Sequence, residues 1–338
     1  MATIRDLAKR TGYSVTTISR VLNNDPTMKV TDNTRVAILE AAAELNYSLP
    51  KPKRLGKNHA PRIAVAEMMT QKEQLSDPYY LYLKNYVVRA CMEQGYMVSY
   101  LSEVSEGGGI AGQGELDGIL AVGIFSEEQI RQMEEISKAI IFVDSSPDEQ
   151  QYDSVVLNFK LGVEQALDYL MQHGHYRIGF LGPTYKLDQK KRPAPEVRRQ
   201  YFREYMTEIG RYDECWVIDT MLTLDETREQ VKKWLQSGEQ RPTAFLAYNE
   251  ETAITAVSVF QEAGIRIPED ISIISFNDTP LSILIEPPLT SINAHLESMG
   301  RVAVKLLKER LEDHQHIPYK VVLPLTLSER SSVKDYQE

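Results

Sequence analysis

The chain has 338 residues, of which 42% are hydrophobic, and its formal net charge is −10 at pH 7. This length predicts two or three domains. The hydrophobic content is enough for sizeable cores, which excludes a disordered chain. Charged residues interrupt the N-terminus and no run of eighteen apolar residues occurs, so we expect no secretory signal, no membrane helix and no membrane partner. Cys91 and Cys215 are far apart, which favours ordinary thiols and a cytoplasmic location over a disulfide framework.

The charge is divided unevenly along the chain. Residues 1–58 contain ten Lys and Arg against five Asp and Glu, a balance of +5, so the other 280 residues carry −15. A basic segment attached to an acidic body is typical of a module that binds phosphate at one end only. The division therefore predicts a separate nucleic-acid-binding module at the N-terminus.

Residues 3–22 have the pattern of a helix-turn-helix. Thr3 can cap a helix with Ile4, Leu7 and Ala8 on one face, and Gly12 permits a sharp turn. Ser14 can cap a second helix, whose inward positions are Ile18, Val21 and Leu22. The second helix of such a motif enters the DNA major groove, and its outward side chains here are Val15, Thr16, Ser19 and Arg20. The alternative is an ordinary pair of amphipathic helices.

A third helix and a linker are predicted next. Thr31 can cap a helix from about Asp32 to Leu45, which completes a small headpiece. Residues 49–62 contain three prolines and five basic residues without hydrophobic periodicity, which indicates a linker. Its charge can contact phosphate, or the segment can be a solvated tether.

From residue 62 onward, short apolar runs alternate with helical patterns. The predicted strands are Ile63–Met68, Met97–Leu101, Gly118–Val122, Ala139–Val143, Ser154–Leu157, Arg177–Leu181, Trp216–Ile218, Ala244–Ala247, Ser272–Phe276 and Val321–Leu323. The predicted helices are Tyr79–Gln94, Glu127–Ile136, Leu161–His173, Glu196–Ile209, Glu226–Gln236, Glu251–Ala263 and Leu296–Leu311. Such alternation predicts parallel sheets, and about ten units exceed one open sheet, so we expect two α/β lobes with a ligand cleft between them.

Polar residues follow several predicted strands at the edge where such a cleft would open. They are Asp144, Asn249 and the pair Asn277 and Asp278, and Arg198 could add a forked donor. Asp and Asn can bridge the adjacent hydroxyls of a sugar. The alternative is that these residues only end strands or cap helices.

Two other motifs have ordinary explanations. The run Gly107–Gly112 fits a dinucleotide fingerprint, but no suitable helix follows, so we interpret it as a flexible loop. His173 and His175 flank Gly174, which is better explained as a helix C-cap than as a metal site. No nucleophile-and-base constellation or metal motif occurs, so we expect no cofactor and no enzymatic activity.

Several short sequence motifs together resemble those of the LacI/GalR family of bacterial repressors. They lie at residues 14–23, 45–47, 169–180, 267–278 and 287–292, in the family's order along nearly the whole chain. The resemblance implies a helix-turn-helix headpiece (1–48), a hinge or linker (49–61) and an effector-binding and dimerisation body (62–338). That body would be like periplasmic sugar-binding proteins of type I: two Rossmann-like lobes, one of about 62–160 plus 292–320 and one of about 161–291 plus 321–330.

The family resemblance also implies partners and site residues. The implied partners are a double-stranded, near-palindromic operator and a small sugar effector. The protein itself would be a homodimer, or alternatively a tetramer. The matching DNA-binding positions are Ser14, Val15, Thr16, Thr17, Ser19, Arg20, Asn23 and, in the hinge, Leu55. The matching effector positions are Asp144, Arg198, Asn249 and Asn277.

Residues 76–80 and 197–202 look most like the galactose or galactoside branch of the family, which predicts a repressor released by its inducer. The alternatives are another sugar or a sugar phosphate as effector, a co-repressed regulator and, remotely, a sugar-binding transport protein. The chain departs from the family pattern at Pro50 and Pro52, which restrict any hinge helix to a start near Pro52. Asn277 also stands where Asp is common, and Tyr201 stands where Gly is frequent.

Overall fold

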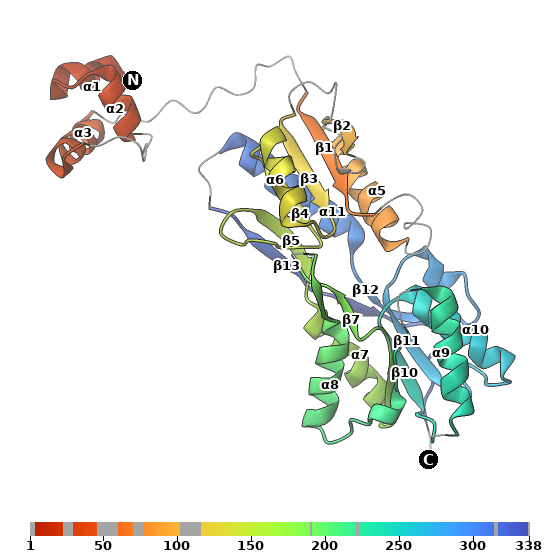
Figure 1. Cartoon of the computed structure of the whole chain (residues 1–338). Helices are drawn as coiled ribbons and strands as arrows, with labels where there is room; N and C mark the ends of the chain where they lie inside the picture. Colours follow the sequence, from red (N-terminus) through yellow and green to blue (C-terminus); the bar gives the residue numbers. More distant parts are fainter. Residues whose placement is uncertain are drawn as a thin grey trace. The chain divides into compact units, whose positions relative to one another are not determined.

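A computed structural model describes residues 4–22, 30–45, 60–69, 78–101, 116–189, 191–220, 223–238, 240–313 and 317–336. The chain divides into two compact units, 1–59 and 60–338, which are described separately (Figure 1). The predicted Thr3 cap, the linker around Pro50, and the run Gly107–Gly112 lie outside the described residues.

The described residues of the first unit form the helices α1 (Ile4–Thr11), α2 (Val15–Leu22) and α3 (Asp32–Glu44), as the sequence predicts. Their common core includes Leu7, Ile18 and Ile38, none of which is exposed. Gly12 has φ +75°, a conformation that side chains with a Cβ rarely adopt, which explains glycine at the turn between α1 and α2. Thr31 caps α3, because its hydroxyl accepts a hydrogen bond from the backbone N–H of Thr34 at 3.3 Å.

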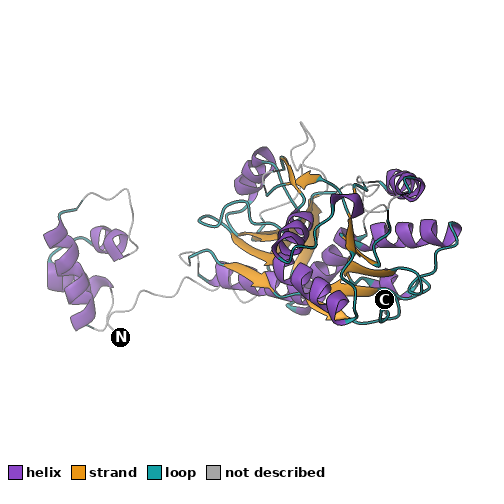
Figure 2. Ribbon diagram, turned by 90° about the horizontal axis from the view of Figure 1, so that it is seen from below, coloured by secondary structure: helices purple, strands orange, loops and turns teal. Residues whose placement is uncertain are grey.

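Besides a two-stranded hairpin, the described residues of the second unit form two six-stranded, mainly parallel sheets with helices on both faces, which Figure 2 shows as strands between helices. The first sheet has the order β13-β5-β4-β3-β1-β2 and is parallel throughout. Its strands are β1 (Arg62–Glu67), β2 (Met97–Leu101), β3 (Gly118–Val122), β4 (Ile140–Val143), β5 (Asp153–Leu157) and β13 (Lys320–Leu323). One face is covered by α5 (Tyr79–Glu93) and α11 (Leu296–Glu312), and the other by α6 (Glu127–Ile136).

The second sheet has the order β14-β12-β11-β10-β6-β9, and only the pairing of β12 with β14 is antiparallel. Its strands are β6 (Ile178–Leu181), β9 (Val217–Ile218), β10 (Ala244–Ala247), β11 (Ser272–Asn277), β12 (Thr290–Asn293) and β14 (Thr326–Ser328). One face is covered by α7 (Phe159–Gln172) and α8 (Val197–Glu208), and the other by α9 (Leu224–Gln236) and α10 (Glu250–Glu262). Short 3-10 helices lie at Glu214–Trp216 and Pro280–Ile283.

The chain crosses between the two lobes three times, after β5, after β12 and after β13. These crossings correct the expected lobe limits at two places. Strand β12 belongs to the second sheet although residues from 292 were assigned to the first lobe, and β13 belongs to the first sheet although residues from 321 were assigned to the second. The sequence pattern did not predict β12, β14 or the hairpin formed by β7 (Tyr185–Leu187) and β8 (Pro193–Pro195).

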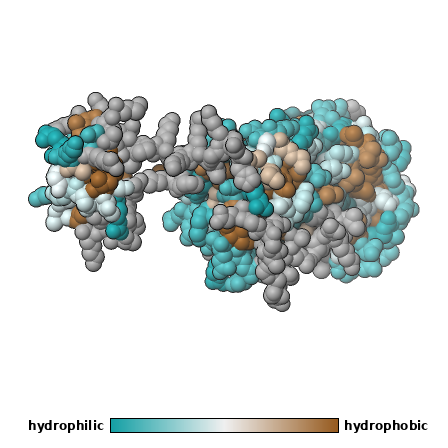
Figure 3. Space-filling model, turned by 90° about the horizontal axis from the view of Figure 1, so that it is seen from above, coloured by the Kyte–Doolittle hydropathy of each residue, from teal (hydrophilic) through white to brown (hydrophobic). Residues whose placement is uncertain are grey.

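Strand alternation explains how each sheet is buried on both faces. In β1, Ile63 and Val65 face α5 and α11, whereas Ala64 and Ala66 face α6. The central strands β3, β4, β6 and β10 are consequently apolar throughout, as expected for a doubly covered parallel sheet. On the face shown in Figure 3, hydrophobic residues form separate patches among hydrophilic ones. Within the described residues, no helix combines the length and apolar character needed to span a bilayer.

Candidate functional site

The first candidate surface is the N-terminal part of α2 in the headpiece. Ser14 caps the helix, because its hydroxyl accepts a hydrogen bond from the N–H of Thr17 at 3.0 Å, and the two hydroxyls lie 2.9 Å apart. The inward side chains Ile18 and Val21 are buried in the headpiece core. The helix is therefore fixed by one side and by its first turn.

The opposite side of α2 carries the predicted DNA-binding residues. Val15 is 41% exposed, Thr16 and Arg20 are exposed, and Ser19 is half-buried. A methyl group, a hydroxyl and a guanidinium on one face of a helix can contact thymine methyls, base edges and guanine respectively. Asn23 and Leu55, which were also predicted to contact DNA, lie outside the described residues.

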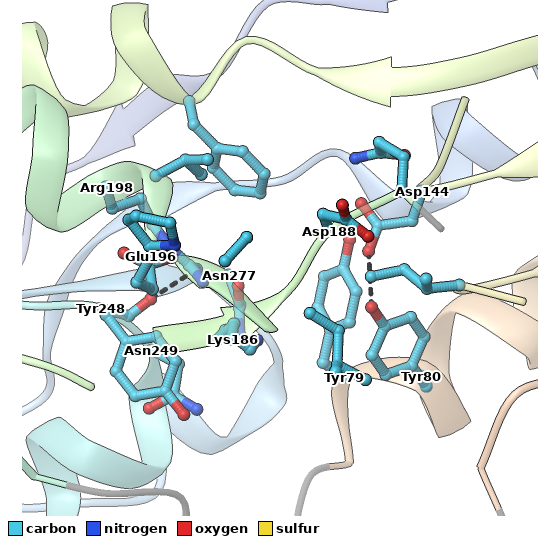
Figure 4. A pocket seen from close by; sticks show the side chains of 17 residues that line it. Tyr79, Tyr80, Asp144, Lys186, Asp188, Glu196, Arg198, Tyr248, Asn249 and Asn277 are labelled. Carbon is cyan, nitrogen blue, oxygen red and sulfur yellow. Dashed lines mark hydrogen bonds and ion pairs between the residues drawn. The ribbon is translucent and has the colours of Figure 1, made fainter. Parts of the chain in front are cut away.

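The second candidate site is a cavity of about 240 Å³ between the two lobes of the second unit. All four predicted effector residues, Asp144, Arg198, Asn249 and Asn277, line it. They follow or begin different elements: Asp144 follows β4, Arg198 lies in the first turn of α8, Asn249 precedes α10 and Asn277 ends β11. Figure 4 shows their side chains around an open space with those of Tyr79, Tyr80 and Tyr248. The strand-end rule therefore accounts for Asp144, Asn249 and Asn277, and Arg198 joins them from the first turn of α8.

Arg198 is held by an aromatic and ionic cage. Its Nε donates to the Glu196 carboxylate at 2.7 Å, and its Nη1 donates to the Tyr248 carbonyl at 2.6 Å. Its guanidinium also lies over the rings of Phe159, Tyr248 and Phe276, at 4.8, 4.9 and 5.6 Å from the centroids. Burial opposes the charged form, but the ion pair with Glu196 holds the pKa of Arg198 above its ordinary value. Arg198 is therefore a fixed cation with donors left for a ligand.

The two asparagines differ in how they are held. The Oδ1 of Asn249 accepts a hydrogen bond from the Thr252 N–H at 3.0 Å and so caps α10. Asn249 can therefore cap α10 and also bind a ligand, because its amide nitrogen does not take part in the cap. Asn277 is 7% exposed, has φ +94°, and its side chain makes no hydrogen bond to another described residue. A buried amide without such a partner is expected to bind a ligand or water.

Asp144 faces these residues from the first lobe. Its carboxylate accepts a hydrogen bond from the Tyr80 hydroxyl at 2.9 Å, and its backbone has φ +67°. Burial raises the pKa of Asp144 to about 6, although the bond from Tyr80 and the charges of Lys186 and Arg198 favour the carboxylate. The Asp144 carboxylate is thus an acceptor whose strength changes near neutral pH.

The β7–β8 hairpin supplies a cavity wall that the sequence pattern did not predict. Lys186, Asp188 and Ala194 of this hairpin line the cavity, and the Lys186 ammonium lies 5.3 Å from the centroid of the Tyr248 ring. Two prolines in β8 hid the hairpin, because proline cannot donate to a strand ladder and argues against a strand.

The histidine pair has the structural role that the sequence favoured. Gly174 has φ +82° directly after the His173 C-cap of α7. Both ring nitrogens of His175 lie 2.9 Å from a partner, Nδ1 from the Thr243 hydroxyl and Nε2 from the Lys334 carbonyl. His175 therefore anchors the C-terminal segment to the second lobe.

Comparisons with known proteins follow this division into headpiece and body. Residues 3–49 match the family "Bacterial regulatory proteins, lacI family", and residues 167–333 match the "Periplasmic binding protein-like domain". The chain is 34% identical over 335 residues to the "HTH-type transcriptional regulator GalR" of Streptococcus thermophilus, covering 99% of this chain and 100% of the relative.

Solved structures show the same architecture. A complex of the transcriptional regulator CelR with cellobiose is 25% identical, with a TM-score of 0.67 over 98% of this chain and 100% of the other. The lac repressor dimer bound to operator and the anti-inducer ONPF is 22% identical, with a TM-score of 0.64 over 98% and 99% of the two chains. The fold of this chain is therefore that of a helix-turn-helix headpiece followed by a two-lobed α/β body.

Proposed function

Because the chain belongs to the lacI family of bacterial regulatory proteins, we propose that it represses genes for the use of galactose or a galactoside and is released from DNA by a sugar. The chain is a DNA-binding transcriptional regulator, and its family is not one of enzymes. The observation that carries the proposed effector role is the cavity between the lobes, where Arg198, Asn249 and Asn277 face Asp144. The name of the GalR relative supports galactose or a galactoside as the sugar.

On DNA, the protein acts as a homodimer on a near-palindromic operator. Each copy inserts α2 into one major groove, with Val15, Thr16 and Arg20 toward the bases. The lac repressor, which shares the fold, is a dimer on its operator, which supports this assembly. Binding both half-sites at once requires the two headpieces to have a fixed spacing.

The charges around the cavity favour a neutral sugar over a sugar phosphate. Asp144, Asp188 and Glu196 contribute three carboxylates, of which Asp188 is paired with Arg192 at 2.8 Å, and Lys186 and Arg198 contribute two cations. The Arg198 charge is already paired with Glu196 at 2.7 Å. A phosphate dianion would therefore enter a cavity with little unpaired positive charge, whereas sugar hydroxyls can use the asparagine amides, the Asp144 carboxylate and the remaining Arg198 donors.

The sugar acts by favouring one arrangement of the two lobes. A ligand changes such an equilibrium only through different affinities for the two arrangements. Here it contacts Asp144 of the first lobe and Arg198, Asn249 and Asn277 of the second, so its affinity depends on how the lobes are placed. A change of lobe arrangement alters the spacing of the two headpieces in the dimer and weakens operator binding.

A thermal-shift screen of the full chain tests the effector class. The probes are galactose, lactose, galactose 6-phosphate and ribose, because a specific ligand stabilises the folded protein by about 2.7 kcal/mol at a concentration 100 times its Kd. We expect galactose or lactose to raise the unfolding temperature, and galactose 6-phosphate to have no effect.

Two variants accompany the screen. Asp144→Asn tests the cavity, because it removes one cavity charge at constant shape, and Gln200→Ala is the control, because it lies at an exposed position of α8. The first should reduce the shift with sugar, and the second should leave it unchanged. Stabilisation by galactose 6-phosphate alone would contradict the neutral sugar. Stabilisation by none of the probes would contradict the galactoside assignment.

A further inference from the structure

The β7–β8 hairpin is fixed at its base to the second lobe. The Thr184 N–H donates to the Asp219 carboxylate at 3.2 Å, and the Glu196 N–H donates to the Thr184 carbonyl at 3.1 Å. Arg199 also donates to the Thr184 hydroxyl at 2.9 Å. The hairpin therefore starts and ends on a clamped base between β6 and α8.

The β7–β8 hairpin contributes several neighbouring side chains to the cavity. Tyr185 points outward and is 61% exposed, whereas Leu187, although 42% exposed, also lines the cavity. Lys186 and Asp188 are partly buried and line the cavity. Asp188 also holds the turn, because its carboxylate accepts hydrogen bonds from the Arg192 side chain at 2.8 and 3.0 Å. The inner face of the hairpin is thus a cavity wall with both polar side chains, such as Lys186 and Asp188, and apolar ones, such as Leu187 and Ala194.

The far part of the hairpin contacts the first lobe. The Oε1 of Gln189, a residue that also lines the cavity, accepts a hydrogen bond from the Ser146 N–H at 2.6 Å, and Lys191 donates to Gln129 of that lobe at 3.4 Å. Ser146 lies two residues after Asp144, so one short loop presents a carboxylate to the cavity and an N–H to the hairpin. The hairpin wall and the Asp144 carboxylate therefore keep a fixed relation as long as Gln189 is bonded to Ser146.

We propose that the β7–β8 hairpin determines effector specificity, because its inner face receives the second ring of a disaccharide. Gln189 positions the hairpin for this role. The proposal rests on the proposed function of the cavity as a sugar site. One ring occupies the space beside Arg198, Asn249 and Asn277, which Figure 4 shows on one side of the opening. Asp144 and Asp188 lie on the opposite side of that view, where they can bind hydroxyls of a second ring.

The test compares galactose and lactose by isothermal titration calorimetry on the full chain and on three variants. Gln189→Ala removes the acceptor, Gln189→Glu keeps one, and Gln200→Ala is the matched control on α8. We expect wild type to bind lactose more tightly than galactose. One lost hydrogen bond corresponds to about a three- to tenfold weaker affinity, and we expect Gln189→Ala to show this loss for lactose only.

The acceptor-retaining variant Gln189→Glu should restore most of the lactose affinity, and Gln200→Ala should match wild type. Equal loss of galactose and lactose binding in Gln189→Ala, or no loss of either, would overturn the hairpin proposal and leave the sugar site intact. Altered operator affinity of Gln189→Ala without sugar would also overturn it, because Gln189 would then act on the fold as a whole. If wild type binds neither sugar, the proposed function fails, and the hairpin proposal fails with it.

Discussion

The Arg198 cage leads to the most informative substitution in this protein. From the sequence alone, Arg198→Ala is expected to remove the response to sugar and leave operator binding intact. In the structure, the same change leaves the Glu196 carboxylate, which is 2% exposed, without its ion-pair partner at 2.7 Å. Breaking one side of a buried pair costs about 3–5 kcal/mol, which for a unit of this size corresponds to a fall of about 10 °C in the unfolding temperature. Arg198→Ala should therefore destabilise the body as well as weaken sugar binding.

A double variant separates the two effects. Arg198→Met combined with Glu196→Gln removes both charges at similar volume, and replacing a whole buried pair is often neutral for stability. We expect its unfolding temperature to return most of the way to that of wild type. Its sugar affinity should stay about ten- to a hundredfold lower, because a hydrogen bond from a charged donor contributes about 1.5–3 kcal/mol.

The assays are thermal unfolding without ligand and calorimetric titration with the sugar identified in the screen. Arg198→Lys is a useful third variant, because it keeps the charge beside Glu196 and loses the fork. Wild-type sugar affinity in the double variant would refute the assignment of Arg198 to the effector. Equal stability of Arg198→Ala and wild type would refute the buried ion pair as a structural contact.

Three further predictions concern DNA reading and pH. Arg20→Ala should reduce the preference for DNA selected from a random pool over unselected DNA by about 1–3 kcal/mol. A gel shift with undiminished preference would contradict the role of α2. Burial raises the pKa of Asp144 to about 6, so sugar affinity should fall as the pH is lowered through about 6, where the Asp144 carboxylate becomes protonated. Asp144→Asn should lose this pH dependence. Superimposable wild-type binding isotherms on both sides of pH 6 would exclude a role of the Asp144 carboxylate in sugar binding. Burial also raises the pKa of Glu250 from 4.5 to about 7, against hydrogen bonds from Ser282 and Thr279, so its contribution to stability is full below about pH 4.5 and is lost as the pH rises to about 7. The unfolding temperature of Glu250→Gln relative to wild type should therefore rise between about pH 5 and pH 8, and a relative fall would contradict this sign.

Much of the fold follows from local pattern. The spacing of Ile18 and Val21 and the Gly12 turn were sufficient for the headpiece helices, because helix periodicity and a positive φ leave direct signatures in a sequence. Apolar runs alternating with helices predicted the two parallel sheets, and the rule that ligands bind beyond strand ends brought Asp144, Asn249 and Asn277 together. Each of these inferences uses information within a few residues.

The parts that were missed depend on contacts between distant residues. The short strand β14 pairs with β12 across more than thirty residues and has no repeating pattern of its own. The partnership of Arg198 with Glu196 was also hidden, because residues two apart do not face each other on a helix. Glu196 can reach Arg198 because it is the extended N-cap of α8, with φ −69° and ψ 123°. Its identity as the partner required the three-dimensional structure.

The proposed mechanism requires that a sugar in the cavity lowers the affinity for operator DNA. The direct measurement is fluorescence anisotropy of one labelled near-palindromic duplex, selected from a random pool, without sugar and at a saturating concentration of the sugar found in the screen. Couplings between two sites are typically about 5- to 150-fold, so we expect the Kd for the duplex to rise at least fivefold in wild type. The Kd should stay unchanged in the Arg198→Met, Glu196→Gln variant. An operator affinity that is unchanged or increased at saturating sugar would contradict release of the protein from DNA by the sugar.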